Sequence, residues 1–228
     1  MKHLLYKEFK LAVPPLSYLL IVLLAMSALS PAFPSFVPLL YMGCSYTFLF
    51  IGMNKTTTTN DLYYTCTLPI RREDVVKARV ATLTVIQAIE TALVFAFMSV
   101  ATFLFDAQSV KAGNDSMQVS LNMRQPIALL AVYLISYSVY DLIYLPWFYK
   151  NGKSIIANML VGILATAVVA AGLTISLFFL AGEQLTVGGA KANYLLQAGL
   201  LLVSIGIFIC VKVLVIKLCT KNLKKLDF

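Results

Sequence analysis

The chain has 228 residues, of which 60% are hydrophobic and only 12% are charged. Soluble domains average about 45–50% apolar and about 25% charged residues, so these proportions exclude a water-soluble globule. At about 20 residues per membrane-spanning helix, the length allows six spans and leaves no room for a separate soluble catalytic domain. The formal net charge is +8, but the basic residues stand in short runs between apolar stretches, which argues against a nucleic-acid surface.

The cysteines and the histidine do not suggest a metal site. The four cysteines, Cys44, Cys66, Cys210 and Cys219, form no C-x-x-C pair, and His3 is the single histidine. Because zinc and iron–sulfur sites need clustered ligands, we expect free thiols and no metal or other cofactor bound by this chain. The first apolar run has no convincing A-x-A cleavage site, so we expect it to be retained rather than removed as a signal peptide.

Six long apolar runs predict an all-α, polytopic membrane protein that forms a single transmembrane domain over residues 1–228. The predicted spans are 16–30, 36–53, 80–105, 126–148, 155–181 and 193–216. Before the first span, an apolar stripe beside a polar, mostly basic face predicts a helix lying in the cytoplasmic membrane interface. The stripe and the face consist of Leu4, Leu5 and Phe9, and of Lys2, Lys7, Glu8 and Lys10. A frayed polar terminus is the alternative.

The distribution of basic residues predicts the orientation. The N-terminus, the loop 54–79, the segment 149–154 and the C-terminal end from Lys212 hold 15 of the 18 Lys and Arg residues. Only Lys111, Arg124 and Lys191 lie on the other side. The positive-inside rule therefore places both termini in the cytoplasm, in agreement with an even number of spans.

The loop 54–79 is longer and more apolar than a simple connector. Pro69 suits the first turn of a helix, Glu73 and Asp74 sit near its positive end, and Glu73 and Lys77 form an i, i+4 pair in the favourable order. We therefore expect a short amphipathic helix before the third span. It could dock on a cytoplasmic protein, or it could rest on anionic lipid. The basic residues for the lipid alternative are Arg71, Arg72, Lys77 and Arg79.

Three strings of this sequence resemble one family. LPIRREDVVKARV, between the second and third spans, resembles the LP-(I/V)-(S/T)-R-x-x-(I/V)-V-x-(A/S)-(K/R) pattern of membrane subunits of bacterial type 2 ABC exporters. LPWFYKNGKS, at the cytoplasmic end of span four, resembles that family's P-(L/I)-x-F-(K/R)-x-G string, and MKHLLYKEFK resembles its start. One departure is Arg71, which takes the place of a small residue before Arg72.

The resemblance implies an ABC transporter permease subunit in a bacterial cytoplasmic membrane. The segment from Ile70 to Lys77 would be the coupling helix that fits a groove on a separate ATP-binding subunit. The coupling residues would be Leu68, Pro69, Ile70, Arg71, Arg72, Glu73, Asp74 and Lys77. Two ATP-binding subunits, carrying the ATP and Mg, would pair with this chain and a second permease, identical or related. The resemblance extends to exporters of phenol-soluble modulins, which implies amphipathic or antimicrobial peptides as substrates.

The chain itself lacks the means to hydrolyse ATP. Gly152, Lys153 and Ser154 end like a phosphate-binding loop, but the first glycine of G-x-x-x-x-G-K-S would fall on Trp147. The sequence also contains no protease or hydrolase motif, and one histidine near a terminus cannot anchor a catalytic triad. We therefore expect a transporter component and not an enzyme.

Two acids, Glu90 and Asp141, fall inside predicted spans, where a charge costs about 2.5–3.5 kcal/mol even on the mildest scale. Polar side chains recur beside both acids at helical spacing, which predicts faces that point inward. These neighbours are Thr84, Gln87, Thr91, Tyr133, Tyr137, Tyr140 and Tyr144. The faces could border a route for a cationic or amphipathic substrate. Alternatively, the acids could be protonated or hydrogen-bonded by these neighbours and hold the helices together.

The fifth span predicts close helix packing, because Gly162, Thr166 and Ala170, with Ala167 and Ala171, follow small-x-x-x-small spacing. Two other functions remain compatible with the sequence. A non-transporting membrane sensor or immunity scaffold could use the same loop to bind a partner. A standalone secondary carrier would need no docking loop, and the two halves show no inverted repeat of the kind that many carriers have.

Overall fold

The computed structural model describes residues 2–12, 22, 26, 71–105, 126–151, 155–181 and 193–224. Its long helices are α5 (Arg72–Phe105), α6 (Pro126–Asn151), α7 (Ile155–Ala181) and α8 (Tyr194–Lys224). All four are long and apolar enough to cross a membrane. The first two predicted spans lie outside the described residues except at Val22 and Met26, which are helical.

The helix ends follow local sequence signals. Pro126 is the first residue of α6, where its missing N–H would have no helical partner in any case. Asn193 precedes α8, and its Oδ1 accepts a hydrogen bond from the backbone N–H of Leu196 at 3.1 Å. A side-chain oxygen at this position satisfies a donor that the first turn of the helix leaves open.

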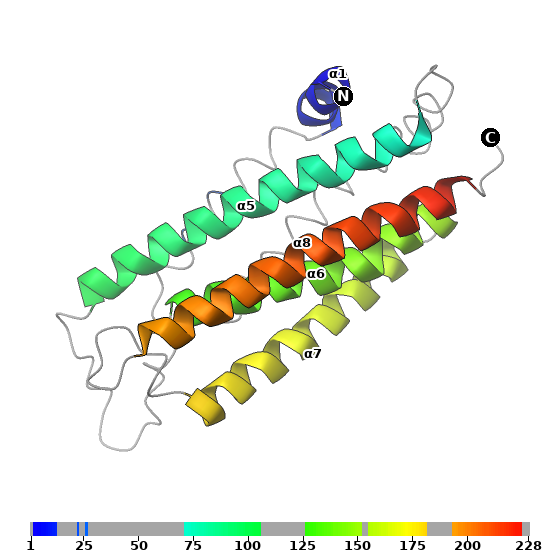
Figure 1. The fold of residues 1–228 in the computed structure, drawn as a ribbon. Helices are drawn as coiled ribbons and strands as arrows, with labels where there is room; N and C mark the ends of the chain where they lie inside the picture. The colour runs from blue at the N-terminus through cyan, green and yellow to red at the C-terminus, as the bar shows by residue number, and fades with distance from the viewer. Residues whose placement is uncertain are drawn as a thin grey trace.

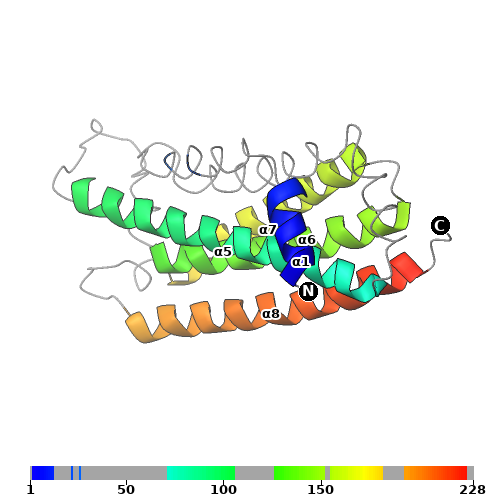
Figure 2. The same cartoon turned by 90° about the horizontal axis from the view of Figure 1, so that it is seen from above.

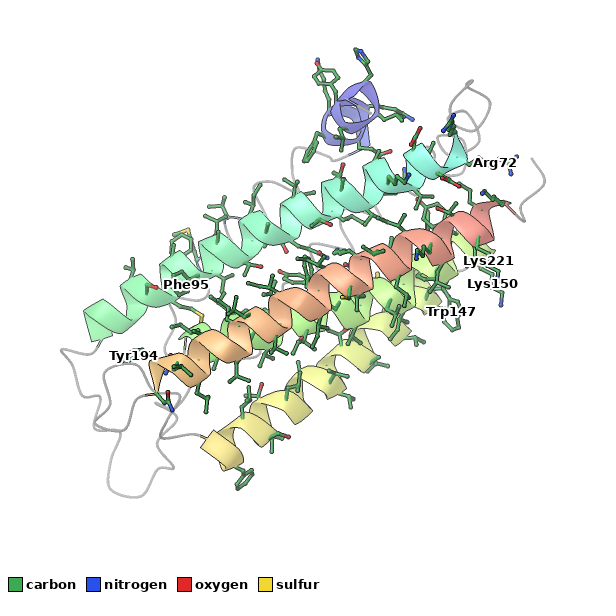
Figure 3. All side chains as sticks on the ribbon, in the orientation of Figure 1. Arg72, Phe95, Trp147, Lys150, Tyr194 and Lys221 are labelled. Carbon is green, nitrogen blue, oxygen red and sulfur yellow. The ribbon has the colours of Figure 1, made fainter. Side chains whose placement is uncertain are left out.

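The four long helices lie side by side and alternate in direction (Figure 1). The start of α5 and the ends of α6 and α8 therefore meet at one end of the bundle. Arg72, Lys150 and Lys221 lie at this end and Tyr194 lies at the other (Figure 3). Helix α6 is central, since it packs against α5, α7 and α8.

Two buried apolar clusters lie inside the bundle. One joins α5, α6 and α8, and the other joins α5 and α6, with Phe208 of α8 packed against it. The cluster nearer the start of α5 includes Val76, Val80, Leu83, Ile86, Tyr140, Tyr144, Leu145, Phe148, Tyr149, Val215, Cys219 and Leu223. The second includes Val94, Met98, Leu129, Tyr133 and Tyr137. Helix α7 packs on the bundle along one face and exposes Leu164, Val168 and Phe179 on another. In a bilayer these exposed side chains suit contact with apolar surroundings rather than water.

The N-terminal segment is helical, as expected from its stripe. Helix α1 (Lys2–Lys7) continues into a π-helical turn, η1 (Glu8–Ala12), and both pack against α5. Seen from above, α1 crosses α5 (Figure 2). Leu4 of the apolar stripe is buried within the protein, and Glu8, which we assigned to the polar face, is also buried.

One expected element differs from the structure. The sequence predicts a short helix from Ile70 to Lys77 that is separate from a third span beginning at Val80. In the structure α5 runs without a break from Arg72 to Phe105. The physical reason is that the segment from Arg72 to Val80 contains no glycine or proline that would interrupt the helix. Residues 72–79 are therefore the first turns of the long helix.

Candidate functional site

Three polar side chains, one from each of three helices, meet inside the bundle. Gln87 of α5 donates through Nε2 to both carboxylate oxygens of Asp141 of α6, at 3.2 Å each. Lys212 of α8 donates through Nζ to Gln87 Oε1 at 2.7 Å and forms an ion pair with Asp141 Oδ2. We call Gln87, Asp141 and Lys212 the polar cluster. It connects α5, α6 and α8 through side-chain hydrogen bonds.

The polar cluster is shielded from its surroundings. The exposed fraction is 0% for Asp141, 2% for Gln87 and 7% for Lys212. An isolated charge at such depth would be costly, and here the two charges are opposite and hydrogen-bonded. The Lys212 ammonium also lies 4.8 Å from the centroid of the Phe208 ring, within the range of a cation–π contact. Asp141 therefore has its charge balanced by this chain's own lysine.

A second polar contact lies one helical turn away. Tyr137 donates its hydroxyl to Glu90 Oε2 at 2.8 Å. Glu90 follows Gln87 by three residues on α5, and Tyr137 precedes Asp141 by four on α6, so the antiparallel helices place both contacts in adjacent layers. Both side chains are buried. The prediction that the acids point inward is confirmed.

The predicted tyrosine stripe is part of the core. Tyr133, Tyr137, Tyr140 and Tyr144 are each at most 3% exposed. The rings of Tyr140 and Tyr144 stack at 5.5 Å between centroids, and Tyr144 stacks in turn on Phe148 at 6.1 Å. These side chains pack against one another and against α5 and α8. Their position fits the interpretation in which the polar faces hold helices together.

The predicted threonine neighbours donate their hydroxyls to carbonyls of their own helix. Thr91 is half-buried and donates its hydroxyl to the carbonyl of Gln87 at 2.6 Å, and Thr84 donates to the carbonyl of Val80 at 2.7 Å. Threonine in a helix commonly bonds to its own preceding turn in this way. Of the predicted neighbours, Gln87 donates to Asp141 and Tyr137 donates to Glu90.

Lys212 was not predicted to be a member of this site. From the sequence we assigned it to the basic C-terminal end, yet it lies 12 positions before the end of α8 and pairs with Asp141. A signal was present, because Val211 and Val213 flank Lys212 within an apolar run, whereas Lys217, Lys221 and Lys224 recur on the polar end of the helix. One cation and one anion in two different spans are typical of an intramembrane ion pair.

The predicted coupling residues that the structure describes lie at the start of α5. Arg71 is exposed just before the helix, and Arg72, Glu73, Asp74 and Lys77 are half-buried in its first turns. Leu68, Pro69 and Ile70 lie outside the described residues. The predicted Glu73–Lys77 pair is present at 4.0 Å.

This end of α5 is also attached to the end of α8. Lys224 donates to Glu73 Oε1 at 2.9 Å, and Arg72 donates to the backbone carbonyl of Leu223 at 3.3 Å. The arginine satisfies a carbonyl at the negative end of α8, which is a favourable position for a cation. Sequence reasoning did not foresee these contacts, because 151 residues separate the partners.

A buried ion pair fastens the N-terminal segment to α5. Arg79 donates through Nε and Nη2 to the two carboxylate oxygens of Glu8, at 3.3 Å each. Both side chains are nearly inaccessible, at 3% and 4% exposed. Arg79 was one of four basic residues named for the lipid alternative, and its pairing with Glu8 leaves Arg71, Arg72 and Lys77 for that contact. The two-pronged geometry suits the guanidinium group and the carboxylate.

Among the described residues, no group of three or more His, Cys, Asp or Glu side chains is placed to bind a metal ion. Cys210 and Cys219 are free thiols, the first exposed and the second buried. The described part of the chain thus contains apolar helices and an internal polar cluster. It also has a charged end, which is the end of the bundle where α5 begins and where α6 and α8 end.

Comparison with known proteins identifies the family. A model of the ABC-2 family transporter proteins matches residues 3–223, nearly the whole chain. No curated protein and no solved structure matches the chain. The family match agrees with the apolar spans and with the absence of an ATP-binding motif in the sequence. The chain belongs to the ABC-2 transporter family, as a membrane permease subunit whose family works with an ABC ATP-binding subunit.

Proposed function

We propose that this chain is the permease subunit of an ATP-driven exporter that moves amphipathic or antimicrobial peptides out of a bacterial cell or its membrane. Two ATP-binding subunits and a second permease, identical or related, would complete the transporter, with both termini of this chain in the cytoplasm. The family match supports the permease role. The observation that carries the ATP-driven mechanism is that one helix, α5, begins among the charged residues at Arg72 and also contains Gln87 of the polar cluster.

Helix α5 is suited to carry a movement into the membrane. Arg71 precedes the helix at its exposed end, and Gln87 lies 15 residues after Arg72 on the same unbroken helix. At 1.5 Å per residue this distance is about 22 Å. A push on the start of α5 by a docked ATP-binding subunit would therefore reach the contacts of Gln87 with Asp141 and Lys212. The separate coupling helix is not needed for this mechanism.

The ion pair of Asp141 with Lys212 leaves one intramembrane acid as a candidate for binding basic groups of a peptide. Both intramembrane acids were candidates for attracting basic groups of a peptide. Because Lys212 balances the charge of Asp141, such an attraction would come from Glu90, whose carboxylate accepts a hydrogen bond from Tyr137. The proposed peptide substrate otherwise depends on the resemblance of the chain to exporters of amphipathic peptides within that family.

Co-purification tests the proposed partner. The chain would be co-expressed with candidate ABC ATP-binding subunits encoded in the same genome, and the detergent-purified complex assayed for ATP hydrolysis. Arg71→Glu reverses an exposed charge at the start of α5. It should lower the co-purified ATP-binding subunit by about tenfold or more, since a like-charge contact across an interface costs several kcal/mol. Arg71→Lys keeps the charge and should retain the complex.

Two outcomes would contradict the proposal. If the folded wild-type chain retains none of the ATP-binding subunits, the sensor or scaffold function becomes the better one. If Arg71→Glu and Arg71→Lys bind equally well, the docking surface lies elsewhere. Export of a lysine-rich amphipathic peptide from cells that express the complex tests the substrate class, and Glu90→Gln should reduce this export if Glu90 attracts the peptide.

A further inference from the structure

A hydrogen bond fixes how the ends of α6 and α8 lie beside each other. Asn222 of α8 donates through Nδ2 to the backbone carbonyl of Pro146 of α6 at 2.9 Å. The neighbours of these two residues, Lys221 and Trp147, therefore lie at the same level of the bundle. Trp147 is the single tryptophan of the chain and is 41% exposed.

Two further lysines extend this surface. Lys150 follows Trp147 by three residues on α6, and Lys217 precedes Lys221 by four on α8, so each pair shares a helix face. All three lysines are exposed. Trp147, Lys150 and Lys221 lie together at the charged end of the bundle (Figure 3). We call Trp147, Lys150, Lys217 and Lys221 the basic rim.

The lysines of the basic rim differ from the other described lysines of α5 and α8. The ion pairs among the described residues use Lys77, Arg79, Lys212 and Lys224, and none uses a lysine of the basic rim. The rim lysines are also absent from the hydrogen bonds within the described part of the chain. Their ammonium groups each present three donors and so can contact an external anion.

The residues next to the basic rim are apolar and exposed. Leu214 and Leu218 are 47% and 38% exposed, and each precedes a rim lysine of α8 by three residues. Leucines and lysines therefore alternate along one face where the apolar part of α8 ends. Such a face matches a molecule that has an acyl chain beside an anionic head. Tryptophan with lysine is typical of the headgroup level of a membrane.

We propose that the basic rim binds an anionic phospholipid of the adjoining leaflet. The lysines would donate to its phosphate, Trp147 would lie at the level of its glycerol backbone, and Leu214 and Leu218 would contact its acyl chain. The combination of exposed leucines and exposed lysines favours a lipid over a soluble protein, which would meet the charges but not the apolar side chains within the membrane.

Native mass spectrometry of the full-length chain tests this proposal, using the complex where an ATP-binding subunit co-purifies. The protein would be titrated with phosphatidylglycerol and with phosphatidylcholine in the same detergent. The wild type should bind phosphatidylglycerol more tightly. Lys150→Gln/Lys221→Gln should weaken that binding by roughly tenfold or more and leave phosphatidylcholine binding unchanged, because two lysines at the membrane surface are lost.

The matched control removes the same charge elsewhere. Lys7→Gln/Lys10→Gln changes two lysines on the predicted interfacial face of the N-terminal segment, which packs against α5. Because these lysines lie outside the basic rim, this variant should keep the wild-type preference for phosphatidylglycerol. Equal losses in both double variants would overturn the proposal in favour of a diffuse attraction, and so would a wild type without preference. A rim variant that loses an ATP-binding subunit but keeps its lipid would show that the rim docks protein instead.

A third variant tests the contribution of Trp147, and a folding control accompanies all variants. Trp147→Phe retains an aromatic side chain and removes the indole N–H, and gel filtration would establish that each variant is folded. Trp147→Phe should weaken phosphatidylglycerol binding less than the loss of both lysines. If folded Lys150→Gln/Lys221→Gln binds phosphatidylglycerol as the wild type does, the proposal is wrong.

Discussion

At the scale of single residues, the pairing of Asp141 with Lys212 is the contact with the largest consequences. Removal of one member of a buried ion pair leaves the other charge without its partner, which is more damaging than removal of both. Gln87 contacts both charges and cannot replace either of them, because its amide is neutral. The stability of the bundle should therefore depend on the two residues jointly.

A double-mutant cycle measures this dependence. Asp141→Asn and Lys212→Met should each destabilise the folded chain by about 3 kcal/mol, since each leaves a buried charge uncompensated. This corresponds to a fall of about 6–12 °C in Tm for a chain of this size. The double variant should be more stable than the sum of the single losses predicts. Thermal unfolding in detergent gives the three values, and strictly additive losses would show that the pair is not coupled.

The contact of Tyr137 with Glu90 gives a second prediction. Tyr137→Phe removes the donor and leaves a buried carboxylate oxygen without that hydrogen bond, which should cost about 1–3 kcal/mol. Glu90→Gln keeps an acceptor oxygen and should cost less. Thermal unfolding of both variants compares them, and a larger loss for Glu90→Gln would indicate that the charge of Glu90, rather than its hydrogen bond, stabilises the bundle.

The sequence predicted which of these residues point inward, but not all of their partners. Helical spacing places Gln87, Glu90, Tyr137 and Asp141 on buried faces, because periodicity is a local property. The pairing of Asp141 with Lys212 depends on how α6 and α8 pack, and 71 residues separate the two. No local pattern encodes such a register.

At the scale of helices, α7 illustrates how small residues position their neighbours. A Cβ atom added at Gly162 would lie 3.0 Å from one ring carbon of Tyr140 and 3.3 Å from another. Tyr140 is buried and stacked on Tyr144, so its ring has little freedom to move away. Thr166 and Ala170 continue this buried face of α7 as predicted, whereas Ala167 is exposed.

The two glycines of α7 form a matched pair for a test. Gly162→Ala should destabilise the chain by about 1–3 kcal/mol, the usual cost of overpacking a close contact. Gly172→Ala meets nothing within 4 Å and should be neutral or stabilise the chain by up to about 1 kcal/mol, because alanine favours the helix. In detergent, Gly162→Ala should therefore have a lower Tm than the wild type, and Gly172→Ala should have an equal or higher one. Equal shifts would mean that Tyr140 adjusts without cost.

The long helices were predictable, and their ends less so. The predicted span 155–181 has the same limits as α7, since a long apolar run between polar segments defines both. Helices α5 and α8 extend eight residues beyond the predicted spans, at the start and at the end respectively. These extra turns carry charged residues between apolar ones, so their mean hydropathy is too low to define a span, although the backbone continues as helix.

At the scale of the whole molecule, alternation of the helices gathers charge at one end. Arg71 directly precedes α5, Lys150 lies near the end of α6, and Lys221 and Lys224 lie near the end of α8. Arg72, Lys150 and Lys221 are seen at this same end in Figure 3. The opposite end carries Tyr194, at the start of α8. Because basic residues favour the cytoplasmic side, the charged end should face the cytoplasm in a membrane. This orientation is also what docking of an ATP-binding subunit at Arg71 requires.

Cysteine labelling in intact cells tests the orientation. In a background without Cys44, Cys66, Cys210 and Cys219, Lys150→Cys and Lys221→Cys should resist a membrane-impermeant maleimide until the cells are opened. Tyr194→Cys, at the other end of α8 and 57% exposed, should react in intact cells. Lys150→Cys and Lys221→Cys lie on different helices and must agree. Reaction of both in intact cells, with protection of Tyr194→Cys, would invert the orientation and exclude docking of a cytoplasmic ATP-binding subunit at the start of α5.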